Sequence, residues 1–334
     1  MADLTTLRIT DELFLDDIRD LYIPGSVAEP TLLRVYNQVT KFGSGLGPVT
    51  QSELLLEGYF YGNADDARIS LDFRNIFRRM FDNDLTGGFS ERNTKRIKWE
   101  FGAESKEIRI YLCYSDIKSK ITDIDYLAVP SDATLWLSGY APGEYNFYLY
   151  VEQCGSLIRI EDGLSGSDYD RIVYGSLSVP DLPIIRNKPF RIVWKVLSLE
   201  QYAEKYEYKS PVYEIIDDDF QQFIFADRFG GYTSFPMRGA LEFSPEYEFE
   251  NARYSFGNAA VSRTISPVFT QYTGGLTWKA AFALSGLLKS DFIYHKVNGS
   301  WKRIVVESAD TRFQTVDSLH YGSFSFRYSE ETTI

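Results

Sequence analysis

The chain has 334 residues, of which 47 are acidic and 35 are basic, so its formal net charge is −12. A field of this sign repels phosphate backbones and anionic membrane surfaces, which argues against nucleic acid as a partner. Hydrophobic residues make up 44% of the chain and charged residues 25%, as in globular domains and unlike disordered or fibrous chains. A chain of this length predicts two or three domains, each large enough to bury a core.

Targeting and membrane signals are not visible in the sequence. Residues 1–19 are acidic and contain neither the basic start nor the apolar run of a secretory signal. No stretch approaches the roughly 18 consecutive apolar residues of a membrane-spanning helix, so we expect no membrane insertion. The two cysteines, Cys113 and Cys154, lie in strand-like apolar runs where a small free thiol usually packs, and no disulfide framework is expected. The sequence therefore predicts synthesis in the cytoplasm.

The first predicted domain spans residues 1–130 and combines strands with one short helix. Near residues 72–81, apolar side chains recur at helical spacing along one stripe. The basic cluster on the opposite face comprises Arg74, Arg78 and Arg79. We interpret it as the solvated side of an amphipathic helix rather than as a nucleic-acid contact.

The second and third predicted domains span residues 131–210 and 211–334, with boundaries at the proline-containing turns around Pro130 and Pro211. In the third domain, a helix is expected from an N-cap at Thr277 to Lys289. Its core-facing side is expected to comprise Trp278, Ala281, Leu284, Leu287 and Leu288.

Strands are predicted wherever apolar and polar residues alternate with period two. The clearest such segments are Glu107–Leu112, Tyr145–Val151, Phe190–Val196 and Ser323–Tyr328. The dipeptide Asn298-Gly299 lies between two apolar runs and suits the positive φ angles of a type I′ hairpin turn, which also accounts for the glycosylation-like pattern with Ser300. The 24 Tyr and 24 Phe favour strands as well. The expected fold class is therefore mainly β, with several antiparallel β-sandwich or sheet domains and two or more short helices packed on them.

Residues suited to catalysis or metal binding are scarce in this chain. The two histidines, His295 and His320, lie in strand-like segments with no cysteine or carboxylate at a recognisable ligand spacing. A two-histidine metal site stays open as an alternative, but ordinary edge or surface histidines are the favoured interpretation. No nucleophile elbow, zinc-protease helix or Cys–His signature is present. We therefore expect no enzyme activity, no catalytic residue, no metal site and no cofactor.

Three polar segments could hold a ligand but lack the corresponding motif. Phe42–Pro48 is glycine-rich without the Lys-Ser/Thr of a phosphate loop or the spacing of a dinucleotide fingerprint, and we expect a flexible loop that orders on a partner. The acidic clusters Asp217–Asp219 and Glu161–Asp170 supply oxygens without the alternating ligands and glycine of a calcium loop. Solvated turns are the favoured interpretation of both clusters, with calcium binding left open.

A set of short motifs carries a family resemblance. In the last third of the chain they comprise Asp219–Tyr232, Gly239–Phe243, Phe269–Thr277, Ser290–Tyr294 and Phe324–Tyr328. In the first two thirds they are confined to Ile69–Phe77 and Ala141–Tyr145. Together they resemble proteins encoded in the structural modules of tailed phages and prophages of gut Bacteroidetes. None of these motifs is an enzyme motif.

The resemblance implies a virion structural protein of the tail tip, the baseplate or a related tail component, made in the host bacterial cytoplasm. The implied partners are other phage structural proteins and further copies of the same chain, in contact through loops and strand edges. The alternative expectation is a carbohydrate- or protein-binding β-sandwich module, in which exposed Tyr and Trp side chains form a platform. The two expectations differ in whether the surplus aromatic residues serve subunit contacts or line one exposed groove.

Overall fold

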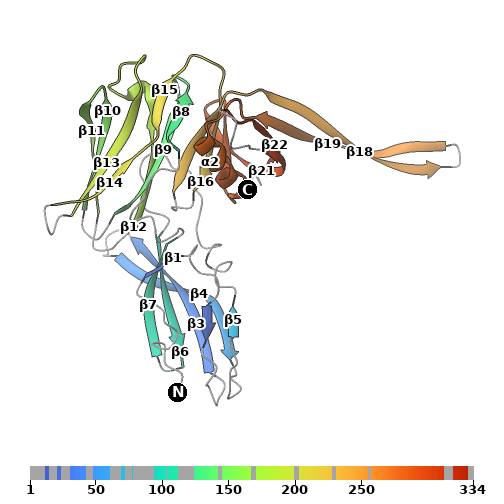
Figure 1. Ribbon diagram of the computed structural model, residues 1–334. Helices are drawn as coiled ribbons and strands as arrows, with labels where there is room; N and C mark the ends of the chain where they lie inside the picture. The colour runs from blue at the N-terminus through green and yellow to red at the C-terminus, as the bar shows by residue number, and fades with distance from the viewer. Residues whose placement is uncertain are drawn as a thin grey trace.

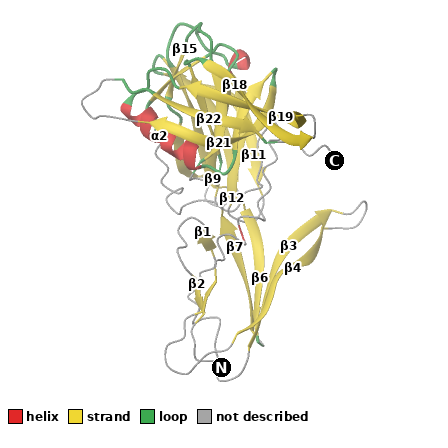
Figure 2. Cartoon of the chain, turned by 90° about the vertical axis from the view of Figure 1, so that its right-hand side faces the viewer, coloured by secondary structure: helices red, strands yellow, loops and turns green. Residues whose placement is uncertain are grey.

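The structure is a computed structural model. It describes residues 12–14, 21–23, 31–42, 48–60, 69–71, 77, 94–102, 104–111, 124–141, 145–166, 171–198, 203–227, 231–254, 257–311 and 319–329. Strands predominate and form several mainly antiparallel sheets, which confirms the predicted fold class (Figure 1). The sheets fall into an N-terminal group and an upper group, and α2 lies against the upper group (Figure 2).

The N-terminal group contains a five-stranded sheet with its own core. Its strands in spatial order are β1 (Glu12–Phe14), β7 (Glu104–Tyr111), β6 (Thr94–Phe101), β3 (Thr31–Phe42) and β4 (Pro48–Phe60). A two-stranded sheet pairs β2 (Leu21–Ile23) with β5 (Ile69–Leu71). The predicted helix near residues 72–81 and its arginine cluster lie outside the described residues, except for Phe77. This residue is helical, fully buried and 5.8 Å from Trp99, ring centroid to ring centroid.

The middle of the chain forms two sheets that enclose a core. The larger sheet contains β11 (Ser156–Gly166), β10 (Tyr145–Gln153), β13 (Phe190–Ser198), β14 (Ala203–Lys209), β15 (Val212–Ile215) and β8 (Tyr126–Val129). The smaller sheet pairs β12 (Arg171–Ser178) with β9 (Thr134–Ala141), and a 3-10 turn, η4 (Val179–Asp181), follows β12. The predicted strands at Glu107–Leu112, Tyr145–Val151 and Phe190–Val196 correspond to β7, β10 and β13.

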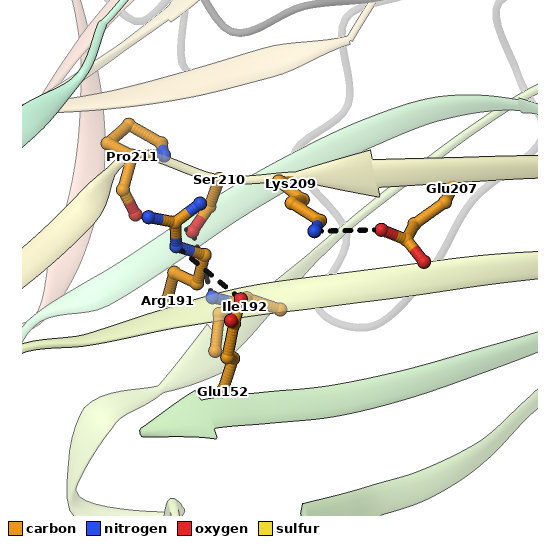
Figure 3. Close-up of polar contacts among 7 residues, drawn as sticks. All are labelled: Glu152, Arg191, Ile192, Glu207, Lys209, Ser210 and Pro211. Carbon is orange, nitrogen blue, oxygen red and sulfur yellow. Dashed lines mark hydrogen bonds and ion pairs between the residues drawn. The ribbon is translucent and has the colours of Figure 1, made fainter. Parts of the chain in front are cut away.

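A proline interrupts the strand beside β13 and splits it into β14 and β15, which both pair with β13. Ser210, the residue before Pro211, keeps this segment hydrogen-bonded to β13. The Ser210 N–H donates to the Ile192 carbonyl (2.9 Å), and the Ile192 N–H donates to the Ser210 hydroxyl oxygen (2.9 Å), as Figure 3 shows for the latter bond. The ion pairs Arg191–Glu152 and Lys209–Glu207 lie on the same sheet.

The C-terminal sheet has seven strands. In spatial order they are β17 (Tyr232–Met237), β16 (Gln221–Ala226), β20 (Ile293–Val297), β21 (Ser300–Thr311), β22 (Gly322–Tyr328), β19 (Gly257–Tyr272) and β18 (Leu241–Tyr254). The turn between β20 and β21 has positive φ at Asn298 (50°) and Gly299 (80°), which confirms the predicted hairpin, and β22 confirms the predicted last strand.

The helix α2 (Trp278–Lys289) covers this sheet as predicted, and the Thr277 hydroxyl accepts from the Ala280 N–H (3.3 Å) as the predicted N-cap. Leu284 and Leu287 are fully buried and pack with strand residues such as Phe225. The expected burial of Trp278 is wrong: its side chain is 48% exposed, because at 3.6 residues per turn it lies on the side of α2 opposite to the buried Leu287. Among the described residues, α2 is the one α-helix with defined bounds.

The middle and C-terminal sheets share one continuous core, whose buried residues run from Ile124 to Phe326. At their junction the hydroxyl of Ser234 in β17 accepts from the Trp136 N–H (2.7 Å) and donates to the Thr134 carbonyl (3.0 Å), so that it links the edges of β17 and β9. The strands β8 and β15 lie just outside residues 131–210 and belong to the middle sheet. The three-domain division stays a prediction.

Cys154 differs from the sequence-based expectation. It is exposed and occupies the turn between β10 and β11, with φ of 52° at Cys154 and 77° at Gly155. The strand-like run that precedes it ends at Gln153, one residue before the turn. Cys113 lies outside the described residues.

Candidate assembly surfaces

The β18–β19 hairpin extends beyond the sheet that carries it. The two strands pair from Leu241–Gln271 to Tyr254–Gly257, whereas β22 pairs with β19 over Phe269–Tyr272 alone. The rest of the hairpin projects away from the body as a two-stranded arm (Figure 1). From Glu246 to Tyr254 this arm is about 30 Å long at roughly 3.3 Å per residue. Among the described strands, no third strand pairs with it.

The directions of the backbone groups at the base of the arm follow from two hydrogen bonds. The Tyr272 N–H donates to the Ala240 carbonyl on the β18 side (3.0 Å), and the Thr273 N–H donates to the Gly322 carbonyl on the β22 side (2.9 Å). Because these groups alternate along a strand, the odd-numbered backbone groups of β19 face β22. Pro267 therefore faces the β22 side, where it has no N–H to donate.

A second proline protects the other edge of the arm. Pro245 is the direct partner of Pro267 in the β18–β19 register, so its nitrogen faces the outer edge of β18. Each edge thus loses a backbone donor where the arm leaves the sheet, and prolines in such places oppose the addition of a further strand. The base of the arm is therefore protected against the addition of a further strand.

The two faces of the arm differ in composition. The register pairs Tyr247 with Ile265 and Phe249 with Arg263, and strand alternation puts these positions on the same face as Phe243 and both prolines. The opposite face receives Glu242, Glu246, Glu248 and Glu250, with Thr270, Ser266, Thr264 and Ser262 as their partners. Among the arm residues whose side chains the structure describes, Phe243, Phe269 and both prolines share one face, and Glu242 and Glu246 lie on the other.

The base of the arm is anchored on both faces. On the aromatic face Phe269 lies between Phe243 (5.3 Å) and Phe326 (5.6 Å), measured between ring centroids. On the other face the Arg327 guanidinium is paired with the carboxylates of Glu246 in β18 and Glu307 in β21. The aromatic row that begins in the buried core ends at Phe243, whose side chain is 58% exposed.

A backbone contact also fixes the start of the arm. The buried Gln271 amide donates to the carbonyls of Gly239 (3.0 Å) and Tyr272 (2.5 Å). A Cβ atom at Gly239 would lie 2.1 Å from the Tyr272 carbonyl oxygen, so this close approach requires glycine. The arm is thus held at its base by buried contacts.

A separate apolar patch lies on the body around the first turns of α2. Trp278, Phe282, Leu319 and Tyr321 are 48%, 66%, 48% and 63% exposed. The backbone pairing of Leu276 with His320 holds the 319–321 segment against the start of the helix, and the rings of Trp278 and His320 are 5.2 Å apart. We call these four residues the α2 patch.

His295 is buried, so the expectation of an edge or surface histidine is wrong. It sits in the interior strand β20, with the Phe223 ring stacked on it at 4.6 Å. The Gln221 carboxamide oxygen lies 2.9 Å from Nε2 and only accepts, so Nε2 carries the proton and Nδ1 accepts from the Tyr328 hydroxyl (2.7 Å). Burial lowers the pKa of His295 to about 4, which keeps the ring neutral.

The other candidate residues do not gather into a catalytic or metal centre within the described part of the chain. His320 is buried beside Trp278 and lies outside β20, the strand that carries His295. Within the described residues, no three His, Cys, Asp or Glu side chains are placed to hold a metal ion. Asp218 forms an ion pair with Arg238 (2.6 Å), and Glu161 and Asp162 lie within β11 rather than in a turn.

The glycine-rich segment Phe42–Pro48 joins two paired strands, since Phe42 ends β3 and Pro48 begins β4. Its residues 43–47 lie outside the described part of the chain, as does the acidic segment 167–170. The β18–β19 arm was not predicted from the sequence as a candidate surface. The sequence feature that could have identified it is the alternation of Glu with Tyr and Phe after Pro245 and before Pro267.

Comparison with known proteins does not assign the chain to a family: no protein-family model and no curated protein matches it. Among the described helices, none has the length and apolar character that crossing a bilayer requires. The geometry of the arm and the α2 patch must therefore carry the functional argument.

Proposed function

We propose that this protein is a structural subunit of a tailed-phage particle or a phage-derived particle, in the tail tip, the baseplate or a related tail component. The observation that carries the proposal is the β18–β19 arm, a two-stranded ribbon that projects from a body with a continuous core. The resemblance of the sequence motifs to proteins of phage structural modules is the reason for proposing a phage particle in particular.

The physical argument rests on the stability of a ribbon. An isolated two-stranded hairpin is marginally stable in water, because one face of each strand pair lacks a packing partner. Here the exposed Phe243 lies where the free part of the arm begins, and Pro245 and Pro267 each remove one backbone donor at its base. A neighbouring subunit that covers the face of Phe243 would bury apolar surface and stabilise the ribbon. Assembly subunits commonly reach their neighbours in this way, through elements outside their own core.

The binding-module alternative is favoured by one observation, the exposed Trp278 and Tyr321 rings of the α2 patch. Aromatic rings with exposed faces are suited to stacking on a sugar or on a protein surface. A sugar-binding module would use the patch alone and would leave the arm without a role. An assembly subunit accounts for both surfaces, which is why we favour it.

Mass spectrometry of purified particles from a lysing culture of the bacterium that encodes the chain tests the proposal. We expect the chain to co-purify with tail proteins through a density gradient in a fixed ratio. Its absence from particles that contain the other tail proteins would refute the virion role. Glycan-array binding that is lost in Trp278→Ala would then support the binding module.

A further inference from the structure

The strand β4 forms one border of the N-terminal sheet, and its outer edge is open. The strand order ends at β4, so among the described strands none pairs with that edge, and Figure 2 shows β3 and β4 at the right-hand side of the N-terminal group. The strand at the other border, β1, has 3 residues, whereas β4 has 13. A free strand of this length offers a row of backbone donors and acceptors to an extended segment of another chain.

The direction of the backbone groups of β4 follows from one hydrogen bond. The Gly102 N–H donates to the Leu32 carbonyl (3.0 Å), so the even-numbered backbone groups of β3 face β6 and the odd-numbered ones face β4. A bulge between Leu54 and Leu56 shifts the alternation on β4 by one residue. The residues whose backbone groups face the outer edge therefore include Ser52, Leu54, Glu57 and Tyr59.

Neither face of β4 is covered along residues 51–54. All four of these residues are exposed, although neighbouring residues of a strand point to opposite faces. The side chains of Leu54 and Tyr59 are 50% and 63% exposed, whereas Leu33 and Val35 of the adjacent strand are fully buried. Pairing with a further strand would bury these apolar side chains together with the backbone groups of the edge.

The edge lacks most of the features that oppose strand addition. Between Val49 and Phe60 the chain has no proline and no lysine, and its charged residues are Glu53 and Glu57. The base of the β18–β19 arm, by contrast, carries a proline on each edge. Because soluble proteins commonly protect free edges with proline, lysine or a bulge, the retention of the bulge alone indicates that β4 pairs with a strand.

We propose that the outer edge of β4 pairs antiparallel with the same edge of a second copy, across a two-fold axis at Leu54. In this register Leu54 lies opposite Leu54 of the other copy, and Ser52 lies opposite Glu57. Registers centred on Glu53 or Glu57 oppose two glutamates, and a register centred on Leu56 opposes Leu54 to Glu57. Like charges directly opposite each other destabilise a strand pair, so the register at Leu54 is favoured.

The polar groups beside Leu54 complement each other in this register. The Ser52 hydroxyl oxygen accepts from the Gln38 side chain (3.0 Å), which leaves the Ser52 O–H to donate to a further acceptor. Across the axis it meets the carboxylate of Glu57 of the other copy, which the Arg34 guanidinium holds in place (2.6 Å). The two-fold axis forms this contact twice.

The self-complementary edge names a second copy as the occupant. Two-fold pairing uses the same edge of both copies, so assembly through β4 stops at a dimer and leaves neither edge open. A strand of another protein would also satisfy the backbone groups, but it would leave the match of Ser52 with Glu57 without a role. The inference rests on the N-terminal sheet alone and is independent of the proposed function.

Cross-linking of the purified full chain tests the contact and its register. In Leu54→Cys the two thiols flank the axis, where opposite Cα atoms lie about 5.5 Å apart. In the matched control Tyr59→Cys, on the same face of the same strand, they are eight residue steps apart, or about 26 Å at 3.3 Å per residue. A short bis-maleimide joins the first pair alone. The unsubstituted chain, which retains Cys113 and Cys154, gives the background.

We expect a covalent dimer of Leu54→Cys at a yield at least tenfold above those of Tyr59→Cys and the unsubstituted chain. In sedimentation experiments the unsubstituted chain should form a reversible dimer, and Leu54→Lys should raise its dissociation constant at least tenfold, because two positive charges then meet at the axis. The control Val305→Lys should leave it unchanged, since Val305 is similarly exposed (53%) on a strand that is paired on both sides. Circular dichroism checks that each variant folds.

Three results would overturn the proposal. Equal cross-linking of Leu54→Cys and Tyr59→Cys would refute the register and the axis. Equal dimerisation of Leu54→Lys and Val305→Lys would place the contact elsewhere. A chain that sediments as a monomer at every concentration would exclude a second copy, and this is also the result that an edge reserved for another protein would give.

Discussion

Replacement of His295 by phenylalanine should remove one contribution to the loss of unfolding free energy at acid pH. His295 is 2% exposed and burial lowers its pKa from 6.5 to about 4. Between these two values the unfolded chain binds a proton that the folded chain does not, so the free energy of unfolding falls as the pH falls through this window. A difference of 2.5 pKa units corresponds to about 3 kcal/mol, present at pH 6.5 and above and lost by about pH 4.

The assay is urea unfolding of the wild-type chain and His295→Phe at several pH values from 4 to 7.5. Titration of the 47 acidic residues affects both chains equally, so it cancels in the difference between their unfolding free energies. We expect the wild type to lose about 3 kcal/mol relative to the variant as the pH falls from 6.5 to 4. A difference that stays constant within about 0.5 kcal/mol would refute the neutral, buried histidine, since a histidine whose pKa is the same in the folded and unfolded chains gives no such slope.

Three further substitutions test the packing and the edges. Leu284→Ala should cost about 2 to 5 kcal/mol in chemical denaturation because the side chain is fully buried, and a loss below about 0.5 kcal/mol would mean that α2 is not part of the core. Gly231→Ala should destabilise the chain by at least about 1 kcal/mol in the same assay, since a Cβ would lie 1.9 Å from that of Ser138; unchanged stability would mean that this junction is loose. Pro245→Val should restore a donor on the outer edge of β18 and increase light scattering on concentration, with Ser244→Val as the control whose backbone faces inward; equal scattering by the two variants would contradict the assigned edge.

The strands, the type I′ turn and the helix N-cap could be predicted because each depends on neighbouring residues. The alternation in Phe190–Val196, the Asn298-Gly299 pair and Thr277 before α2 are local signals, and the structure agrees with all three. The partner strands of β13 could not be predicted, because pairing of residues far apart in the sequence leaves no local mark.

The burial of individual side chains was harder to predict than the elements that carry them. His295 occupies a strand position that reads as polar, yet its neighbours in space are Phe223 and Phe326, which come from other strands. The burial of His295 therefore depends on the tertiary arrangement rather than on periodicity. Trp278 is different, since helical periodicity itself places it opposite the buried Leu287 and beside the exposed Phe282.

The projection of the β18–β19 arm beyond its sheet could not be predicted from the sequence either. The alternation of Glu with Tyr and Phe along β18 predicts a strand that is half covered. It does not reveal that the strand continues past its sheet, because that depends on where β22 stops pairing with β19. Position in the sheet, not composition, turns this strand into a candidate contact.

Electron cryomicroscopy of intact particles tests the central claim, that this chain is a repeated assembly subunit, most directly. The account predicts several symmetry-related copies in the tail, with each β18–β19 arm ordered against a neighbouring subunit. A particle map that lacks the chain, or that contains a single copy whose arm contacts nothing, would contradict it.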